Sequence, residues 1–254
     1  MKLLFLGTGT STGVPVIGCD CATCTSTDPS DTRLRASALI TYNDGTNVLI
    51  DCGPDFRRQI LDAGSPPLEA LIVTHSHYDH VGGIDDLRPY CAGHRHFPTY
   101  CKADVADDLR ARNPWSFAKK LYPGVPTFAI HVIEPFKPFD IAGHTIEALP
   151  LMHAALPIIG FKTGNLAYIT DCKTMPDETL NAITGIDTLV INALRHEEHQ
   201  SHLNLDQALD IIAKASPRIA YLTHMSHDMG PEATVQLPPN VRFAHDGLRI
   251  DIKE

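Results

Sequence analysis

The sequence predicts an α/β fold in which strands and helices form the layers of one domain over residues 1–254. Short apolar runs alternate with polar turns along the whole chain, and helix-like segments lie between them. Hydrophobic residues make up 43% of the 254 residues, which is enough apolar surface for one large buried core. No repeat, low-complexity tract or long linker divides the sequence, so a single domain is expected.

Ten apolar runs are typical of strands and cover residues 2–6, 36–42, 47–50, 70–74, 128–133, 145–149, 166–170, 188–192, 218–223 and 248–252. The segment NDGT at 43–46 predicts a hairpin turn between the second and third runs. Helices are predicted over residues 55–63, 102–112, 176–183 and 205–215. The last helix has the clearest apolar face, and Asn204 and Gln207 have capping-box spacing at its start. Residues 88–126 are the least regular part, and either a cover over a site or surface loops with short helices would fit them.

The net charge and the short apolar segments argue against nucleic-acid and membrane partners. Asp and Glu number 30 against 21 Lys and Arg, so the net charge is −9 and nucleic acid is an unfavourable partner. The four apolar residues 3–6 are a shorter stretch than a signal peptide needs. No segment approaches the ~20 apolar residues of a membrane helix. We therefore expect a cytoplasmic protein without a membrane partner.

One short motif contains most of the chemical signal. Residues 73–80 read VTHSHYDH, so an apolar strand runs directly into the candidate ligands His75, His77, Asp79 and His80. His75 and His77 alternate on an extended backbone and can face one ion, whereas the next pair follows at a turn and can face a second. Imidazole and carboxylate are suitable ligands for zinc, manganese or iron, so the motif predicts a metal centre.

The H-x-H-x-D-H spacing resembles the hallmark of the metallo-β-lactamase superfamily. Three later segments resemble its remaining ligand positions in order, namely Met152-His153, Thr170-Asp171 and Thr223-His224. The resemblance implies a four-layer αββα sandwich with a dinuclear site at one edge of the sheets. It also implies two divalent ions, Mn²⁺ or Zn²⁺, with one on His75, His77 and His153, the other on Asp79, His80 and His224, and Asp171 bridging both.

Within that superfamily the chain is similar to the PhnP-type phosphodiesterases, which open a cyclic phosphate on a phosphorylated ribose during phosphonate breakdown. Residues 6–15, LGTGTSTGVP, resemble the opening of that branch. The resemblance further implies a structural zinc ion on Cys19, Cys21, Cys24 and His227, and a proton-shuttling histidine at His202. Three thiolates and an imidazole would make a closed tetrahedral site that ties the loop after the first strand to the loop carrying His224. Three free or buried cysteines are the alternative.

Other candidate residues receive ordinary structural roles. Cys52, Cys91, Cys101 and Cys172 lack metal-ligand spacing and are expected to be small buried residues. Asp51 is expected to support the site or cap a turn rather than bind metal. The segment HEEH at 196–199 lacks the H-E-x-x-H spacing of a zinc protease and receives no role.

The sequence therefore predicts a metal-dependent phosphodiesterase acting on a small, cyclic phosphoribosyl-type substrate. Hydroxide shared by two ions is expected to attack phosphorus while His202 protonates the departing alkoxide, with Asp79 grouped beside it as a catalytic residue. A helix-capping role is the alternative for His202. A homodimer is the assembly considered. Two other functions stay open, an RNA-processing nuclease similar to ribonuclease Z and a non-hydrolytic metal-binding protein of cofactor biosynthesis.

Overall fold

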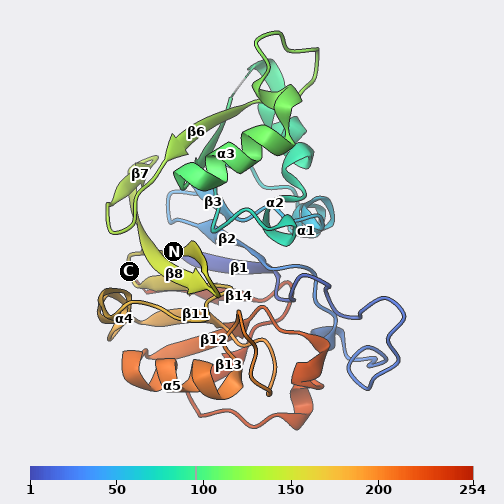
Figure 1. The fold of residues 1–254 in the computed structure, drawn as a ribbon, viewed down its shortest axis with the longest axis vertical. Helices are drawn as coiled ribbons and strands as arrows, with labels where there is room; N and C mark the ends of the chain where they lie inside the picture. The colour runs from blue at the N-terminus through green and yellow to red at the C-terminus, as the bar shows by residue number, and fades with distance from the viewer. Residues whose placement is uncertain (95, 254) are drawn as a thin grey trace.

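Two seven-stranded sheets pack face to face at the centre of the protein, and helices cover both outer faces (Figure 1). The computed structural model describes residues 1–94 and 96–253. This layering is the αββα arrangement that the family resemblance implies.

Each sheet combines parallel and antiparallel pairs. The first contains, in order, β14 (Arg249–Asp251), β1 (Lys2–Gly7), β2 (Ser37–Thr41), β3 (Asn47–Ile50), β4 (Ala70–Ile72), β5 (Phe97–Cys101) and β6 (Phe128–Val132). The second contains β13 (Val241–Phe243), β12 (Ile219–Thr223), β11 (Thr188–Asn192), β10 (Leu166–Ile169), β9 (Leu156–Thr163), β8 (His144–His153) and β7 (Phe139–Ile141). Strands β3 to β6 and strands β10 to β13 run parallel within their sheets. The predicted hairpin turn joins the antiparallel pair β2 and β3.

The five α-helices of the described residues supply the outer layers. The first sheet is covered by α1 (Phe56–Asp62), α2 (Tyr78–Val81) and α3 (Ala103–Arg112), and the second by α4 (Asp177–Ile183) and α5 (Leu205–Ala215). The Gln207 backbone N–H donates to the Asn204 side chain at 2.9 Å, and the Asn204 N–H donates to the Gln207 side chain at 3.2 Å, which confirms the predicted capping box. No helix in the described part of the chain has the length and apolar character needed to cross a membrane.

Alternating side chains along the strands produce three apolar layers. In β1, Leu3 and Phe5 lie between the sheets, whereas Leu4 and Leu6 pack with the helices of the first sheet. A third cluster packs α4 and α5 against the second sheet. The strand ends between these layers are thus fixed by packing on both faces.

Most predicted elements are confirmed with small shifts at their ends, but four strands were not predicted, namely β5, β7, β9 and β13. Pro98 in β5, and Pro157 and Gly160 in β9, interrupt the apolar pattern that marks a strand. Strand β8 extends beyond the predicted 145–149 through Pro150. It tolerates this proline because β7 pairs only with residues 144–146, so the proline N position faces no second strand. Residues 88–126 supply β5 and α3 as well as loops and short helices.

Candidate metal centres

Turns after four strands bring three candidate ligands and the supporting residue Asp51 to one edge of the sandwich. Asp51 follows β3, His75 follows β4, Asp171 follows β10 and His224 follows β12. The φ angles of Asp51, Asp171 and His224 are 58°, 57° and 56°. A non-glycine residue in this left-handed region costs on the order of 1 kcal/mol. The surrounding packing, rather than local preference, therefore holds these turns.

Asp79, His80, Asp171 and His224 form a compact buried group. Their ligand atoms all lie within 4.8 Å of one another. His80 Nε2 is 3.2 Å from Asp171 Oδ2, and His224 Nε2 is 3.1 Å from Asp171 Oδ1. Asp171 thus presents different oxygens to the two histidines. The group unites the three residues predicted for one ion with the predicted bridging residue.

The residues predicted for the other ion lie beside this group. The ring centroid of His77 is 4.6 Å from that of His75 and 5.0 Å from that of His153. The ligand atoms that approach within 4.8 Å of one another here belong to His153, Asp171 and His202. His202, predicted as a proton donor, therefore also occupies the position of a candidate ligand.

Unpartnered ring nitrogens show what this centre is suited to bind. His75 Nε2, His80 Nε2 and His224 Nε2 are buried and make no well-aligned hydrogen bond, although the last two lie 3.2 and 3.1 Å from Asp171 oxygens. A polar atom buried without a partner costs about 1–3 kcal/mol. A divalent cation that accepts these lone pairs would remove the penalty. The donor set of imidazoles and carboxylates therefore fits a metal centre.

Hydrogen bonds to the Nδ1 atoms orient two of the candidate ligands, His80 and His153. His80 Nδ1–H donates to Asp51 Oδ2 at 2.7 Å, and His153 Nδ1–H donates to the backbone carbonyl of Asp171 at 3.0 Å. Such bonds fix the tautomer and ring orientation of a ligating histidine, leaving Nε2 for the metal. Asp51 also accepts hydrogen bonds from the backbone N–H and the hydroxyl of Thr74, each at 2.8 Å. Asp51 thus supports the site, as predicted, and lies outside the convergent ligand groups.

A buried amide holds the turn that carries Asp171. The Asn192 side-chain oxygen accepts from the backbone N–H of Cys172 at 2.8 Å, and its side-chain nitrogen donates to the Cys172 carbonyl at 3.0 Å. One side chain therefore satisfies both backbone groups of the residue after Asp171. The sequence analysis missed Asn192, although a polar residue at the end of the apolar run 188–192 was a signal for it.

Histidine–carboxylate contacts set the charge of the centre. Burial would raise the pKa values of Asp79 and Asp171, but the adjacent His80 and His224 outweigh it and hold both pKa values well below their usual range. Burial lowers the pKa of His75 well below its usual range. Burial would also lower the pKa of His80, yet the surrounding carboxylates raise it well above its usual range. Carboxylates that favour a proton on His80 equally favour a cation there.

The pKa of His202 is lower than the sequence analysis expected. Its Nε2 is 3.1 Å from Asp171 Oδ1. A pKa near neutral was expected, but burial lowers the pKa of His202 to about 4, although the hydrogen bond with Asp171 acts in the opposite direction. Asn204 makes the capping bonds of α5, so the alternative of His202 as the cap loses its main support.

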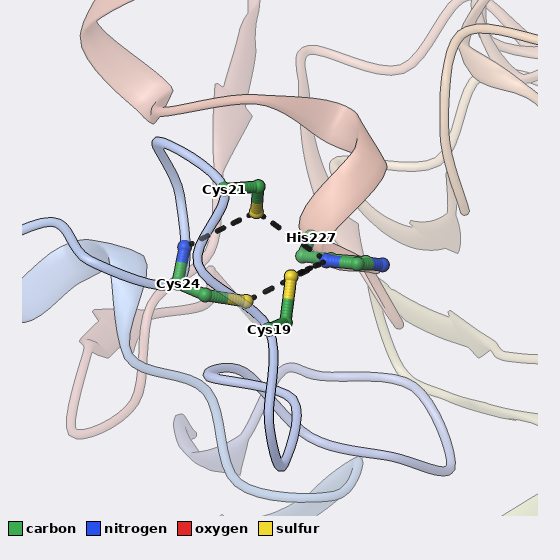
Figure 2. Close-up of side chains that lie close together, drawn as sticks. All are labelled: Cys19, Cys21, Cys24 and His227. Carbon is green, nitrogen blue, oxygen red and sulfur yellow. Dashed lines mark hydrogen bonds between the residues drawn. The ribbon is translucent and has the colours of Figure 1, made fainter.

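Three cysteines in the loop after β1 converge on His227 (Figure 2). The Sγ atoms of Cys19, Cys21 and Cys24 lie 3.2, 3.4 and 3.5 Å from His227 Nδ1. Zn–S and Zn–N bonds of about 2.3 and 2.0 Å in a tetrahedron give a sulfur–nitrogen separation of about 3.5 Å. The four side chains therefore fit a closed zinc site.

A hydrogen bond within the cysteine loop lowers the pKa of one thiol, which favours binding of a cation by the cluster. The backbone N–H of Cys24 donates to Cys21 Sγ and lowers the pKa of Cys21 to about 6. Partial burial raises the pKa of Cys24 to about 11. One thiolate is thus available at neutral pH, and a bound metal would ionise the remaining thiols. The four cysteines outside the cluster are buried, as predicted.

Hydrogen bonds connect the two segments that carry the cysteine cluster to two loops with candidate site residues. The Met225 N–H donates to the Thr8 carbonyl at 2.9 Å, which joins the turn carrying a candidate ligand to the start of the cysteine loop. His196 Nε2–H donates to the Met229 carbonyl at 3.1 Å, which joins the segment of His227 to the loop between β11 and α5. That second loop carries the candidate proton donor.

Comparison with known proteins places this site in a family. Residues 46–225 match the beta-lactamase superfamily domain. The chain belongs to the metallo-β-lactamase superfamily. A crystal structure described as a new diphosphatase from the PhnP family is 37% identical, covers 98% of this chain and 96% of its own, and has a TM-score of 0.90. The PhnP-type resemblance and the metallo-β-lactamase fold are thereby confirmed.

Two further relatives of this metallo-β-lactamase-superfamily chain have different names. A protein named octanoyltransferase from Porphyromonas gingivalis is 42% identical over all of this chain, which spans about half, 52%, of that relative's length. Zinc-bound PqqB from Methylobacterium extorquens shares the fold with a TM-score of 0.80 at 18% identity, over 99% of this chain and 100% of its own. The fold is common to all these proteins, so the activity has to be argued from the site.

Proposed function

We propose that the protein is a metal-dependent phosphodiesterase that hydrolyses a small phosphodiester of the cyclic phosphoribosyl type. The observation that carries the proposal is the convergence on Asp171, where carboxylates and unpartnered imidazole nitrogens meet beside a further histidine, His202. Likeness to a PhnP-family protein supports phosphorus as the reacting centre. A cytoplasmic location, a place in phosphonate breakdown and a homodimeric assembly belong to the same proposal.

In this proposal the described ligands hold two divalent ions. His75, His77 and His153 hold one, Asp79, His80 and His224 hold the other, and Asp171 lies between them. Bound Mn²⁺ or Zn²⁺ would supply Lewis-acid activation of water and positive charge for the phosphoryl oxygens. Asp79, which was also grouped with the catalytic residues, acts here as a ligand. The cysteine cluster holds a third, structural Zn²⁺ outside the reaction.

His202 supplies the proton that an alkoxide leaving group needs. Its Nε2 faces Asp171 and therefore the place where ions and substrate meet. In the free protein, burial lowers the pKa of His202 to about 4. A bound diester brings negative charge next to the ring and raises that pKa, because an adjacent anion favours the protonated form. The proton then passes from Nε2 to the departing oxygen.

Hydrolysis of a diphosphate bond is a second candidate, because the PhnP-family relative is described as a diphosphatase. The leaving group would then be a phosphate, which departs without a full proton transfer since it is far less basic than an alkoxide. Loss of His202 would therefore slow a diphosphate reaction less than the opening of a cyclic diester.

A substrate panel tests the proposal. Metal-reconstituted protein is assayed with a ribose cyclic phosphodiester, bis(p-nitrophenyl) phosphate, a nucleoside-diphosphate sugar and p-nitrophenyl phosphate. We expect the highest kcat/KM on the cyclic diester and its loss in Asp171→Ala, which should also bind less metal. A higher kcat/KM on the diphosphate would establish the second candidate instead, and preference for the phosphomonoester would contradict both.

Three further assays cover the other functions. A precursor tRNA tests the nuclease, and p-nitrophenyl octanoate tests an acyl reaction suggested by the name of the Porphyromonas gingivalis relative. Absence of turnover on every substrate, with the full metal content bound, would favour the non-hydrolytic metal-binding protein.

A further inference from the structure

Helix α3 contacts the middle of the candidate metal-binding motif through a serine. The Ser76 hydroxyl donates to Asp108 Oδ2, and the Ser76 backbone carbonyl accepts from Arg112 Nη1 at 2.8 Å. Asp108 Oδ2 and Arg112 Nη2 are themselves 3.5 Å apart. The two residues are four positions apart on the helix and therefore lie on the same face. One helix face thus holds both the side chain and the backbone of the residue between two candidate ligands.

The segment that carries these ligands lies beyond the end of its strand. Strand β4 ends at Ile72, and residues 75–77 follow it. Within the described residues, the bond from Arg112 is the one hydrogen bond to the backbone of residues 75 and 76. The next backbone bonds are those that the His77 carbonyl accepts at the start of α2. The contacts from α3 therefore restrain a part of the motif that the sheet does not hold.

His77 depends on this restraint more than His75 and His153, the other proposed ligands of its ion. His153 Nδ1–H donates to a backbone carbonyl, and His75 Nδ1 lies 3.0 Å from the Thr74 hydroxyl. In the described part of the chain, no residue forms a hydrogen bond with the His77 ring, which is exposed. The position of this ring therefore follows from its backbone, which α3 restrains one residue earlier.

We propose that Asp108 and Arg112 are positioning residues for the ion that His75 and His77 bind. The pair holds the extended segment so that the two alternating imidazoles face one ion. Ligands that are in place before the metal arrives lose less conformational freedom on binding, which strengthens the affinity. The inference rests on the proposed function, because it takes these histidines as ligands of one ion.

The pair acts through position rather than through charge. Asp108 and Arg112 have opposite charges, so their fields largely cancel at the metal centre. Their side chains are 49% and 47% exposed, and solvent screens the remainder. A second pair on the same helix, Asp107 and Arg110 at 3.0 Å, has the same two charges and makes no described hydrogen bond to Ser76. That second pair is the matched control.

Binding of Mn²⁺ to protein whose cysteine cluster is filled with Zn²⁺ tests the inference without activity. Titration followed by electron paramagnetic resonance measures free Mn²⁺. We expect two bound Mn²⁺ per chain in the wild type, and one of the two sites weakened about 10–100-fold in Asp108→Ala and in Arg112→Met. The control variants Asp107→Ala and Arg110→Met should retain both affinities. Equal weakening in the controls would overturn the inference, because any charge change on α3 would then suffice.

Ser76 tests the same contact from the opposite side and does not depend on whether the α3 variants fold. Ser76→Ala removes the hydroxyl that Asp108 accepts from, whereas Ser76→Thr keeps a hydroxyl there. We expect the alanine variant to weaken the same single site and the threonine variant to bind both ions as the wild type does. Thermal unfolding should change little in either variant. Weakening of both sites together would overturn the inference, because the contact would then support the fold in general.

His77→Ala separates this inference from the proposed function. Loss of one Mn²⁺ in His77→Ala with full affinity in Asp108→Ala and Ser76→Ala would overturn the positioning role and leave the proposed ligands standing. Selective weakening in the α3 variants, without turnover of any phosphodiester by the wild type, would support the positioning role and refute the proposed function. Two ions still bound in His77→Ala would overturn both.

Discussion

At the scale of single residues, His202 has two chemical roles open to it. Its Nε2 lies 3.1 Å from Asp171, close enough to join a metal shell, yet its other nitrogen is bonded within its own loop rather than to a carboxylate or backbone carbonyl. The seven predicted histidine and aspartate ligands around it come from strand ends, from turns after strands or from α2. His202 comes from a loop that is tied to a helix start.

Removing His202 distinguishes these roles. If it is a general acid, His202→Ala should retain the full metal content and lose roughly 10²–10⁴ in rate on the cyclic diester. The loss should shrink on bis(p-nitrophenyl) phosphate, because p-nitrophenolate leaves without a proton. Rates on both substrates and metal analysis are measured together. Loss of one ion per chain would show instead that His202 is a ligand.

Asp51 gives a second test at this scale. Asp51→Asn removes the carboxylate oxygen that accepts from His80 Nδ1–H, so the His80 ring loses its orientation. We expect metal affinity to fall about 10–100-fold, the usual effect of removing such a supporting bond. Competition with a chelator measures it. Asp62→Asn, an exposed carboxylate paired with Arg58, is the control and should leave the affinity unchanged.

At the scale of secondary-structure elements, the sequence predicted what local pattern determines. Uniform apolar runs such as β3 and β11 were predicted with their observed bounds, and α5 was predicted with its cap. Strand β9 was missed because Pro157 and Gly160 break its pattern and its pairing with β8 and β10 defines it instead. Short strands such as β13 are defined by their neighbours in the sheet rather than by their own three residues.

For the site, too, what depends on local sequence could be predicted, and what depends on long-range contacts could not. The candidate ligands were named from the spacing of one motif and from the family resemblance of three later segments. The partners of the supporting residues were not predicted, because these contacts join residues far apart in sequence. Asn192 reaches Cys172 over 20 residues, and the Asp51 carboxylate reaches His80 over 29.

The cap of α5 provides the prediction at this scale. Asn204→Ala removes the acceptor for the Gln207 N–H and the donor to the His196 carbonyl. We expect the free energy of unfolding to fall by about 1–2 kcal/mol, the usual effect of losing a cap. Urea denaturation followed by circular dichroism measures the change. Asp210→Ala, on the exposed face of the same helix, should alter it by less than about 0.5 kcal/mol. Equal effects of the two substitutions would show that the cap contributes nothing specific.

At the scale of the whole molecule, the cysteine cluster joins segments separated by more than 200 residues. Cys19 and His227 are 208 positions apart, yet their side chains lie 3.2 Å apart. The sheet β14–β1 pairing and this cluster both connect the beginning of the chain to its end (Figure 1). The cluster therefore restrains the loop after β1 and the segment around His227, which lie outside the strands of the two sheets.

Loss of one thiolate should show this restraint. Cys21→Ser is expected to release about one zinc ion per chain and to lower the melting temperature, because binding of a structural zinc ion contributes directly to folding. Metal analysis after dialysis and thermal unfolding measure both effects. Cys91→Ser, at a buried cysteine outside the cluster, should leave the zinc content unchanged. A wild-type protein without zinc at the cluster would refute the assignment.

The bond from His196 to Met229 has a consequence for how any sample of this protein would behave. It attaches the loop of the proposed proton donor to the segment that carries His227, so we expect that loop to be better ordered in molecules whose cysteine cluster is filled. A sample with incomplete zinc at the cluster is then a mixture of a competent and an impaired population. Its apparent kcat should rise in proportion to occupancy of the cluster, with KM constant, even when the dinuclear centre is saturated. Specific activity would thus report the filling of a metal site that never meets the substrate.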